Sequence, residues 1–503
     1  MYRKNHRRKT GNVSGLLKTA AVLAAVIAAL VLTGCGKEEK ARFASPQEYY
    51  RHVETAALED MGERFDERYD KAVQTAYAFD RRTDTEMTLE LFQPAQNMLE
   101  TYTGMDFSWL KTLGVAAGVD LAEDSAAVEL ALSLNGRELI GMEVLADIAG
   151  RTLYGRLPLL SKEYFRAGFD ELGLYGVDQA VFGQREEMFD ALPDGQMFSD
   201  LLLRCAEAAL ENVEDVEQGS DTLEAGGVSA KYTTLTVTLD EDELHDMVKD
   251  VCKLLKKDKD VEAFFAYMEE QIGTGIYDDF LDALDELPGY IKLDDDIVMT
   301  LYVDGDDVIR GREIEYDDLI LRYVRPVDGR DFGFEVSCEL DGDMLWRISG
   351  DGREDGDTLE ATSTFEVDDT EWFTLSIEDL DMERLDEGEL IGTFTLRPTY
   401  EFYSFCGFYS LTARALEDFS YALEAEENAA AFNVYMSGGP FLALTLRTES
   451  GPAEGLPNVS GASDLNDWSM SLVLSGGLQD YMSYLEGSDL PPELLRQLMG
   501  ALF

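Results

Sequence analysis

The stretch that decides the fold class is residues 128–147, VELALSLNGRELIGMEVLAD. Apolar side chains alternate with polar or small ones through 128–134 and return through 139–147, a pattern typical of strands. Asn135-Gly136 stands between the two segments and favours the two-residue turn of a β-hairpin, in which both residues take positive φ. The stretch therefore predicts two antiparallel strands joined by a tight turn.

Similar alternation predicts strands along most of the chain. Single strands are expected at 85–91, 152–157 and 228–239. Further hairpins are expected at 297–316 around Asp304-Gly305, at 334–349 around Asp341-Gly342-Asp343, and at 432–447 around Ser437-Gly438-Gly439.

Helical spacing predicts one long amphipathic helix from Pro46 to about Phe79, weakened at Gly62. It begins at Ser45-Pro46-Gln47-Glu48, which matches a capping box with proline at the first helical position. The other predicted helices are 107–117, 198–213, 241–257 with Asp240 as its cap, 261–272, 277–287, 410–425, 477–485 and 492–502.

Hairpins interspersed with helices predict an α+β fold. We expect two lobes, 46–290 and 291–503, each a curved antiparallel sheet of long hairpins packed against helices. The boundary is expected near Pro288 to Lys292. A coarse duplication is consistent with the echo between residues 131–136, ALSLNG, and 300–305, TLYVDG.

The N-terminus predicts export. A basic segment precedes an apolar run from Thr19 to Leu32, which as a helix spans about 21 Å, short of the ~30 Å hydrocarbon core of a membrane. Residues 32–35, LTGC, resemble the lipobox of bacterial lipoproteins. We expect 1–34 to be a cleaved signal peptide, Cys35 to carry the lipid, and 35–45 to be a tether. An uncleaved N-terminal anchor is the alternative. Arg7-Arg8 lacks the apolar pair of the twin-arginine route, which favours general secretion.

The predicted location is therefore the cell membrane, lipid-anchored on its outer, extracytoplasmic face. The formal net charge is −59. Loss of residues 1–34 removes six basic and no acidic side chains and leaves −65. This charge argues against nucleic acid as a partner, because nucleic-acid binding needs a basic surface. It also argues against lying flat on anionic lipid. We interpret the charge as a solubilising surface, with loose collection of Ca²⁺ or cationic ligands as the alternative.

Four cysteines remain after Cys35: Cys205, Cys252, Cys338 and Cys406. They form no Cys-x-x-Cys pair. Two disulfides, in any of three connectivities, and buried free thiols are both open.

No catalytic, cofactor or metal residues are expected. His52 and His245 are the histidines after the signal, and both lie in predicted helices. Hydrolase, zinc, P-loop and dinucleotide motifs are absent from the sequence. Residues 351–357, DGREDGD, superficially match a calcium loop but have Arg353 and Thr362 where ligands are needed, so an acidic turn is expected. The same applies to 304–307 and 294–296.

A cluster of lysines and the four tryptophans each have two possible interpretations. Lys253, Lys256, Lys257 and Lys259 near a helix end suit the helix dipole, with a binding patch as the alternative. Trp109, Trp346, Trp372 and Trp468 are expected in the core, with an apolar cavity as the alternative.

Several segments resemble a family of uncharacterised surface lipoproteins of Gram-positive gut bacteria: 45–50, SPQEYY; 132–139, LSLNGREL; 152–158, TLYGRLP; 161–165, SKEYF; and 226–230, GGVSA. This resemblance implies no activity. The order of helix, hairpins and further helices is remotely similar to lipoprotein carriers of the LolA and LppX type. That similarity implies a half-open barrel around an apolar cavity, by analogy only.

We therefore expect a non-enzymatic, membrane-anchored lipoprotein that binds an apolar or amphipathic ligand. A structural or protein-interaction module of the cell envelope is the alternative. A solute-binding protein of an importer ranks lower, because its fold needs βαβ units. An envelope hydrolase ranks last.

Overall fold

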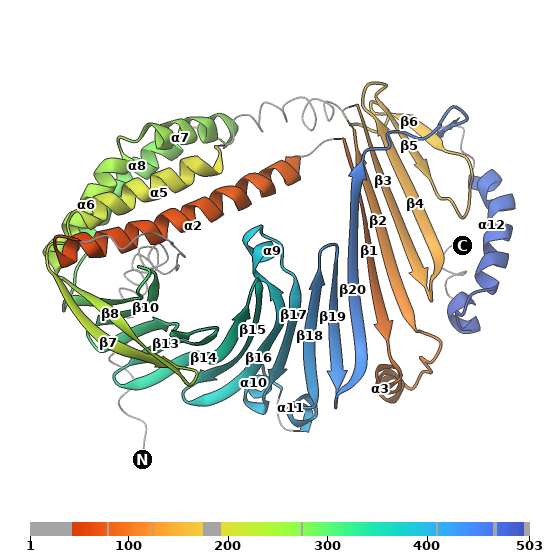
Figure 1. Ribbon diagram of the computed structural model, residues 1–503. Coiled ribbons are helices and arrows are strands. Elements are labelled where there is room, and N and C mark those ends of the chain that lie inside the picture. The colour runs from red at the N-terminus through yellow and green to blue at the C-terminus, as the bar shows by residue number, and fades with distance from the viewer. Residues whose placement is uncertain are drawn as a thin grey trace, which may run out of the picture. The chain divides into compact units, whose positions relative to one another are not determined.

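The computed structural model describes residues 43–77, 80–122, 124–174, 193–272, 275–408, 411–465 and 470–496. In these residues the protein is mixed α+β, with 11 helices and a large, mostly antiparallel, unclosed sheet of 21 strands (Figure 1). The chain divides into two compact units, each assembled from segments that are distant in sequence.

Unit 1 comprises residues 1–73, 191–374 and 382–388. Its strands pair antiparallel in the spatial order β7 (Val216–Ala225), β8 (Val228–Leu239), β9 (Ile297–Val303), β10 (Ile309–Tyr316), β11 (Leu319–Val324), β13 (Asp331–Leu340), β14 (Asp343–Asp355) and β15 (Thr358–Val367), with the short β12 (Val327–Asp328) also on β13. Its helices are α2 (Pro46–Tyr77, as far as Val73), α5 (Gly195–Leu210), α6 (Glu241–Leu255), α7 (Lys259–Ile272), α8 (Ile276–Glu286), the 3₁₀ helix η2 (Leu287–Tyr290) and α9 (Met382–Asp386).

The core of unit 1 lies where α2 packs on β8, β9 and β10. Tyr50 and Val53 of α2 meet Leu235, Leu301 and Ile309 of the strands, and each of these five side chains is at most 1% exposed. Helix α2 begins at the predicted cap, because the Ser45 hydroxyl accepts a hydrogen bond from the Glu48 amide at 3.2 Å. The Glu48 carboxylate reaches back to the Ala44 amide at 2.7 Å. These contacts fix the first half of α2 on the sheet.

Unit 2 comprises residues 74–190, 375–381 and 389–503. Its strands pair in the order β17 (Gly392–Pro398), β18 (Phe419–Glu426), β19 (Ala429–Met436), β20 (Gly439–Pro452), β1 (Arg81–Leu91), β2 (Thr112–Leu121), β3 (Ser125–Leu134), β4 (Arg137–Asp147), β5 (Thr152–Arg156), β6 (Phe165–Gly168) and β21 (Ser463–Asp464). All of these pairs are antiparallel except β6 with β21. Its helices are α3 (Gln93–Thr103), α10 (Tyr400–Phe405), α11 (Leu411–Leu416) and α12 (Met470–Glu486), and β16 (Thr370–Asp381) has residues in both units.

The hairpins are confirmed. Asn135 and Gly136 have φ of 50° and 75°, as a tight turn between β3 and β4 requires, and Ser437-Gly438 repeats this between β19 and β20 at 53° and 79°. Asp341-Gly342 does the same between β13 and β14 at 57° and 81°. Local turn chemistry therefore determines these connections.

Three expectations were wrong. Residues 112–121 form strand β2 where a helix over 107–117 was expected, because β1 and β3 pair with both of its edges. The helix expected over 410–425 ends at Leu416, and β18 follows it between β17 and β19. The acidic stretch 351–357 is mainly the end of strand β14, with only its last residues in a turn. Helix α3 was not predicted.

The expected boundary at 288–292 stays a prediction. Strands β8 and β9, which lie on either side of it in sequence, pair with each other in the described chain. Cys35, the signal segment and most of the tether lie outside the described residues, as does the end of the helix expected over 492–502. Within the described residues, we find no helix with the length and apolar character needed to cross a membrane.

Candidate ligand-binding site

One face of the unit 2 sheet, here called the apolar face, is lined by large apolar side chains. Met87 of β1 lies opposite Val115 of β2 and Leu446 of β20. Side chains directly opposite each other in antiparallel strands share a face. The register therefore places apolar residues of neighbouring strands side by side.

The same register extends across six strands. The apolar face contains ten large apolar side chains that are each 36–46% exposed: Phe432 on β19, Leu446 on β20, Met87 on β1, Leu113, Val115 and Val119 on β2, Val128 and Leu130 on β3, and Ile140 and Met142 on β4. No large apolar residue on the opposite face of these strands is exposed among the described residues. A contiguous exposed patch of this kind marks a binding surface more often than chance exposure does.

The opposite face is more polar and better covered. On it, Arg82 of β1 pairs with Asp84 at 2.8 Å and with Glu129 of β3 at 3.1 Å. Gly114 and Gly118 of β2 are buried on the same side. In most antiparallel sheets with one solvent-exposed face, the apolar face packs on the core and the polar face is exposed. Over these strands the apolar face is the more exposed one.

The apolar face leads into a cavity of about 290 Å³ over β4, β5 and β6. Met142 belongs to both. The apolar part of the cavity's lining comes from the same face of the sheet and from the following loops: Val144, Leu153, Phe165 and Ala167 from the strands, and Leu157, Leu160, Leu172 and Leu465 from the loops. Tyr154 and the charged residues Glu143, Arg156 and Arg166 line it as well. Its size is near the lower end of the ~300–1,000 Å³ range of small-molecule sites.

A polar cluster holds the same strands together from the other side. Arg156 of β5 donates three hydrogen bonds to the carboxylate of Glu143 of β4, two at 2.6 Å and one at 3.1 Å, and Tyr164 donates to the same carboxylate at 2.5 Å. The Arg156 guanidinium lies 4.4 Å from the centre of the Tyr164 ring. Burial, and then the hydrogen bond to Glu143, raise the pKa of Tyr164 to about 12. Because the carboxylate is fully engaged in this cluster, we assign the cluster a structural role.

The two histidines belong to unit 1 and are not part of this unit 2 site. His52 of α2 lies beside the ring of Phe43, 4.9 Å between ring centres. His245 of α6 lines a different cavity, in unit 1. The structure does not bring either histidine to the apolar face.

The four cysteines Cys205, Cys252, Cys338 and Cys406 are free thiols. Burial raises the pKa of the Cys205 thiol to about 11 and raises that of Cys252 and Cys338 as well. A raised pKa lowers the fraction of reactive thiolate at neutral pH, so burial makes these three thiols weaker nucleophiles.

The acidic stretches do not gather into a metal site. Among the described residues, no group of three or more His, Cys, Asp or Glu side chains is arranged to hold a metal ion. Trp109, Trp346 and Trp372 are half-buried and do not line the apolar cavity, and Trp468 lies outside the described residues. The aromatic residues that do line it are Tyr154 and Phe165, which the sequence analysis named only as parts of segments 152–158 and 161–165.

Comparisons with protein-family models, with curated proteins and with solved structures give no match. The geometry is therefore what bears on function. An open apolar surface that continues into a small, mainly apolar cavity can take an extended apolar group.

Proposed function

We propose that this chain is a membrane-anchored extracytoplasmic lipoprotein that binds an apolar or amphipathic ligand and has no enzymatic activity. The observation that carries the proposal is the continuity of the exposed apolar face with the cavity over β4–β6. An extended hydrocarbon chain would cover side chains such as Val115 and Ile140 and enter the cavity past Met142. Each buried methylene would contribute about 0.8 kcal/mol.

The finer architecture belongs to the same proposal. Two lobes, each a curved half-barrel of hairpins covered by helices, would give the chain the design of the LolA and LppX type of carrier. The long hairpins and the unclosed sheet support this analogy. The analogy concerns the form of the ligand site and does not identify the ligand.

The location depends on Cys35. An acylated cysteine at this position would hold the acidic chain on the outer face of the cell membrane. Cys35→Ala should release the protein from the membrane fraction. Retention of this variant after a high-salt wash would refute the lipid anchor and leave the ligand proposal standing.

A protein-interaction module of the envelope is the second candidate, and the exposure of the apolar face favours it as well. The two differ in what fills the cavity. If the chain is a carrier, the purified protein alone should bind a small apolar probe at one saturable site. If it is an interaction module, a protein partner is needed to cover the apolar face.

The test uses the purified chain after lipid extraction, titrated with a fluorescent fatty acid. We expect saturable binding that weakens at least about tenfold in the double variant Ile140→Glu with Met142→Glu, because each added carboxylate must be desolvated to admit an alkyl chain. Leu390→Glu is the control, since Leu390 is 43% exposed, in the same unit and off the apolar face. Equal probe affinity in all three proteins, with no lipid in the extract, would contradict the proposal.

A further inference from the structure

Lysine is concentrated in one short stretch of unit 1. Ten lysines follow residue 45, and five of them lie between Lys249 and Lys259. The chain as a whole carries a net charge of −59. Because the rest of the chain is so acidic, this concentration of lysines makes the segment a candidate site for binding an anion.

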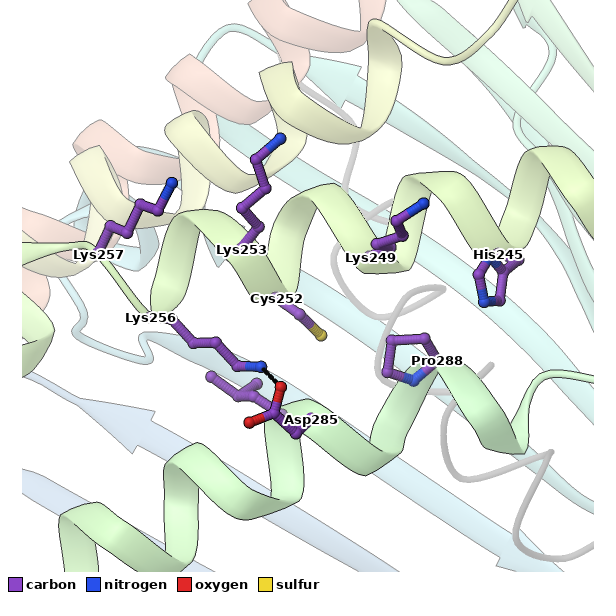
Figure 2. Close-up of a pocket in the computed structure, with 9 residues that line it drawn as sticks. His245, Lys249, Cys252, Lys253, Lys256, Lys257, Asp285 and Pro288 are labelled. Carbon is purple, nitrogen blue, oxygen red and sulfur yellow. Dashed lines mark hydrogen bonds and ion pairs between the residues drawn. The ribbon is translucent and has the colours of Figure 1, made fainter.

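Four of these lysines surround a cavity of about 330 Å³. Lys249 and Lys253 lie on α6, and Lys256 and Lys257 follow its last residues. Asp285 of α8 and Pro288 of η2 form the opposite wall. Figure 2 shows Lys249, Lys253 and Lys257 along one side of the α6 segment, at four-residue spacing, while Lys256 reaches across to Asp285.

The lysines that line this cavity differ in their ion pairs and in their exposure. Lys256 is paired with Asp285, and its side chain is only 25% exposed. Lys249 and Lys253 pair with Asp246 and Asp250 at 3.1 and 3.2 Å, and both lysine side chains are more than half exposed. Exposed pairs of this kind are weak and exchange readily for a better acceptor.

Lys257 has no ion pair among the described residues. The helix dipole favours lysine in the last turn, which accounts for Lys253 and Lys256. It does not account for Lys249, which lies more than one turn earlier, or for the cavity that the four lysines share. Cys252 also lines the cavity, and burial raises the pKa of its thiol, which lowers the fraction of the reactive thiolate.

We propose that this cavity binds a phosphate group, either free inorganic phosphate or the phosphate of a lipid headgroup. A phosphate has several acceptor oxygens and a compact negative charge, and each lysine ammonium group offers up to three donors to it. A long polyanion is a poor fit, because it would bring further negative charges within the ~8 Å over which the surrounding acidic side chains still repel them. The site lies in unit 1 and is independent of the apolar face in unit 2.

The test is calorimetric titration of the full chain with inorganic phosphate, with chloride at equal ionic strength as the reference. In the double variant Lys253→Gln with Lys257→Gln we expect phosphate affinity to fall at least about tenfold. Lys162→Gln with Lys231→Gln is the matched control, since it removes the same charge from two exposed lysines outside the cavity. The control should bind phosphate as the unmodified chain does.

A second arm separates the two sources. The chain is sedimented with phosphatidylcholine vesicles, with and without phosphatidylglycerol. Vesicle binding that needs phosphatidylglycerol and is lost in the cavity variant assigns the site to a lipid headgroup, whereas saturable binding of inorganic phosphate alone assigns it to a free anion. If neither probe binds, or if both double variants bind equally well, the proposal is wrong.

Discussion

Glu54 of α2 and Arg312 of β10 form a two-pronged ion pair in the core of unit 1, with Nη–Oε distances of 2.5 and 2.6 Å. The Glu54 side chain is fully buried and that of Arg312 is 3% exposed. Tyr50 packs beside the pair and is 1% exposed. Moving α2 along the sheet would separate the two groups and leave each buried charge without its partner, which is strongly destabilising. The pair therefore fixes the position of α2 on the sheet.

Glu54→Gln should destabilise unit 1 by about 3–5 kcal/mol, because it leaves the Arg312 guanidinium buried without its counter-charge. Urea unfolding measures the change. Glu59→Gln, an exposed position on the same helix, is the control and should stay within about 0.5 kcal/mol of the unmodified chain. A double variant, Glu54→Leu with Arg312→Met, should be more stable than Glu54→Gln, since it removes both charges. If the double variant is less stable than Glu54→Gln, the cost of an unpaired Arg312 charge does not explain the effect of Glu54→Gln.

Gly333 of β13 is where the tip of the β7–β8 hairpin touches the sheet of unit 1. A Cβ atom at this position would lie 1.8 Å from the carbonyl oxygen of Ala225. Gly333→Ala should therefore displace the hairpin tip and cost about 1–3 kcal/mol, the range for overpacking. Gly305→Ala is the control, because no atom lies within 4 Å of its Cβ position. Equal unfolding midpoints for the two variants would show that the hairpin tip moves freely.

The sequence predicted the elements whose determinants are local. Turn pairs such as Asn135-Gly136 and the capping box at Ser45 specify their own geometry, so hairpins and helix starts were located within a few residues. Strand β2 was missed because the apolar residues between 107 and 117 suit a helix equally well. Pairing with β1 and β3 makes the segment a strand, and this pairing cannot be read from the residues of the segment itself.

The candidate site was less predictable for the same reason. Alternation placed Leu130 and Met142 in predicted strands, but it did not show that they share a face or whether that face is covered. Exposure of the apolar face depends on which elements pack on each side of the sheet. Leu465 and Phe165 line the same cavity although they are 300 positions apart, and no sequence pattern predicts that proximity. Helix α3 did carry local signals, Pro94 at its start and the left-handed Gly104 at its end.

Asp240 caps α6, which carries two of the lysines of the proposed phosphate site. Its carboxylate accepts a hydrogen bond from the Glu243 amide at 2.8 Å, and Glu243 accepts one from the Asp240 amide at 3.1 Å. Asp240→Ala should lower the stability of unit 1 by about 1 kcal/mol, measured by urea unfolding. Asp242→Ala, an exposed acidic residue in the same turn without a capping bond, controls for charge near the helix start. A loss as large in the control would mean that the helix dipole, not the cap, is responsible.

Cys406 should be the thiol in the described chain that an alkylating reagent modifies first. It is exposed, whereas Cys252 and Cys338 are buried and Cys205 is half-buried. Mass spectrometry of peptides after brief native labelling should find the reagent on Cys406, with the other three labelled only in urea. Cys406→Ser should abolish the fast phase. Native labelling of Cys338 at a comparable rate would show that the β13 region opens readily.

Tyr164 should make the stability of unit 2 depend on pH in the alkaline range. Its pKa is raised from 10 to about 12 by burial and by the hydrogen bond to Glu143, so the unfolded chain loses this proton more easily than the folded one. The resulting stabilisation is complete below pH 10 and is lost as the pH rises through about 12. The stability difference between the unmodified chain and Tyr164→Phe should therefore be constant below pH 10 and shrink above it, as followed by urea unfolding at each pH. Tyr102→Phe, which removes the hydroxyl of a side chain that is 81% exposed, should show no such trend. A constant difference for Tyr164→Phe up to pH 12 would mean that the hydroxyl is not buried against Glu143 in solution.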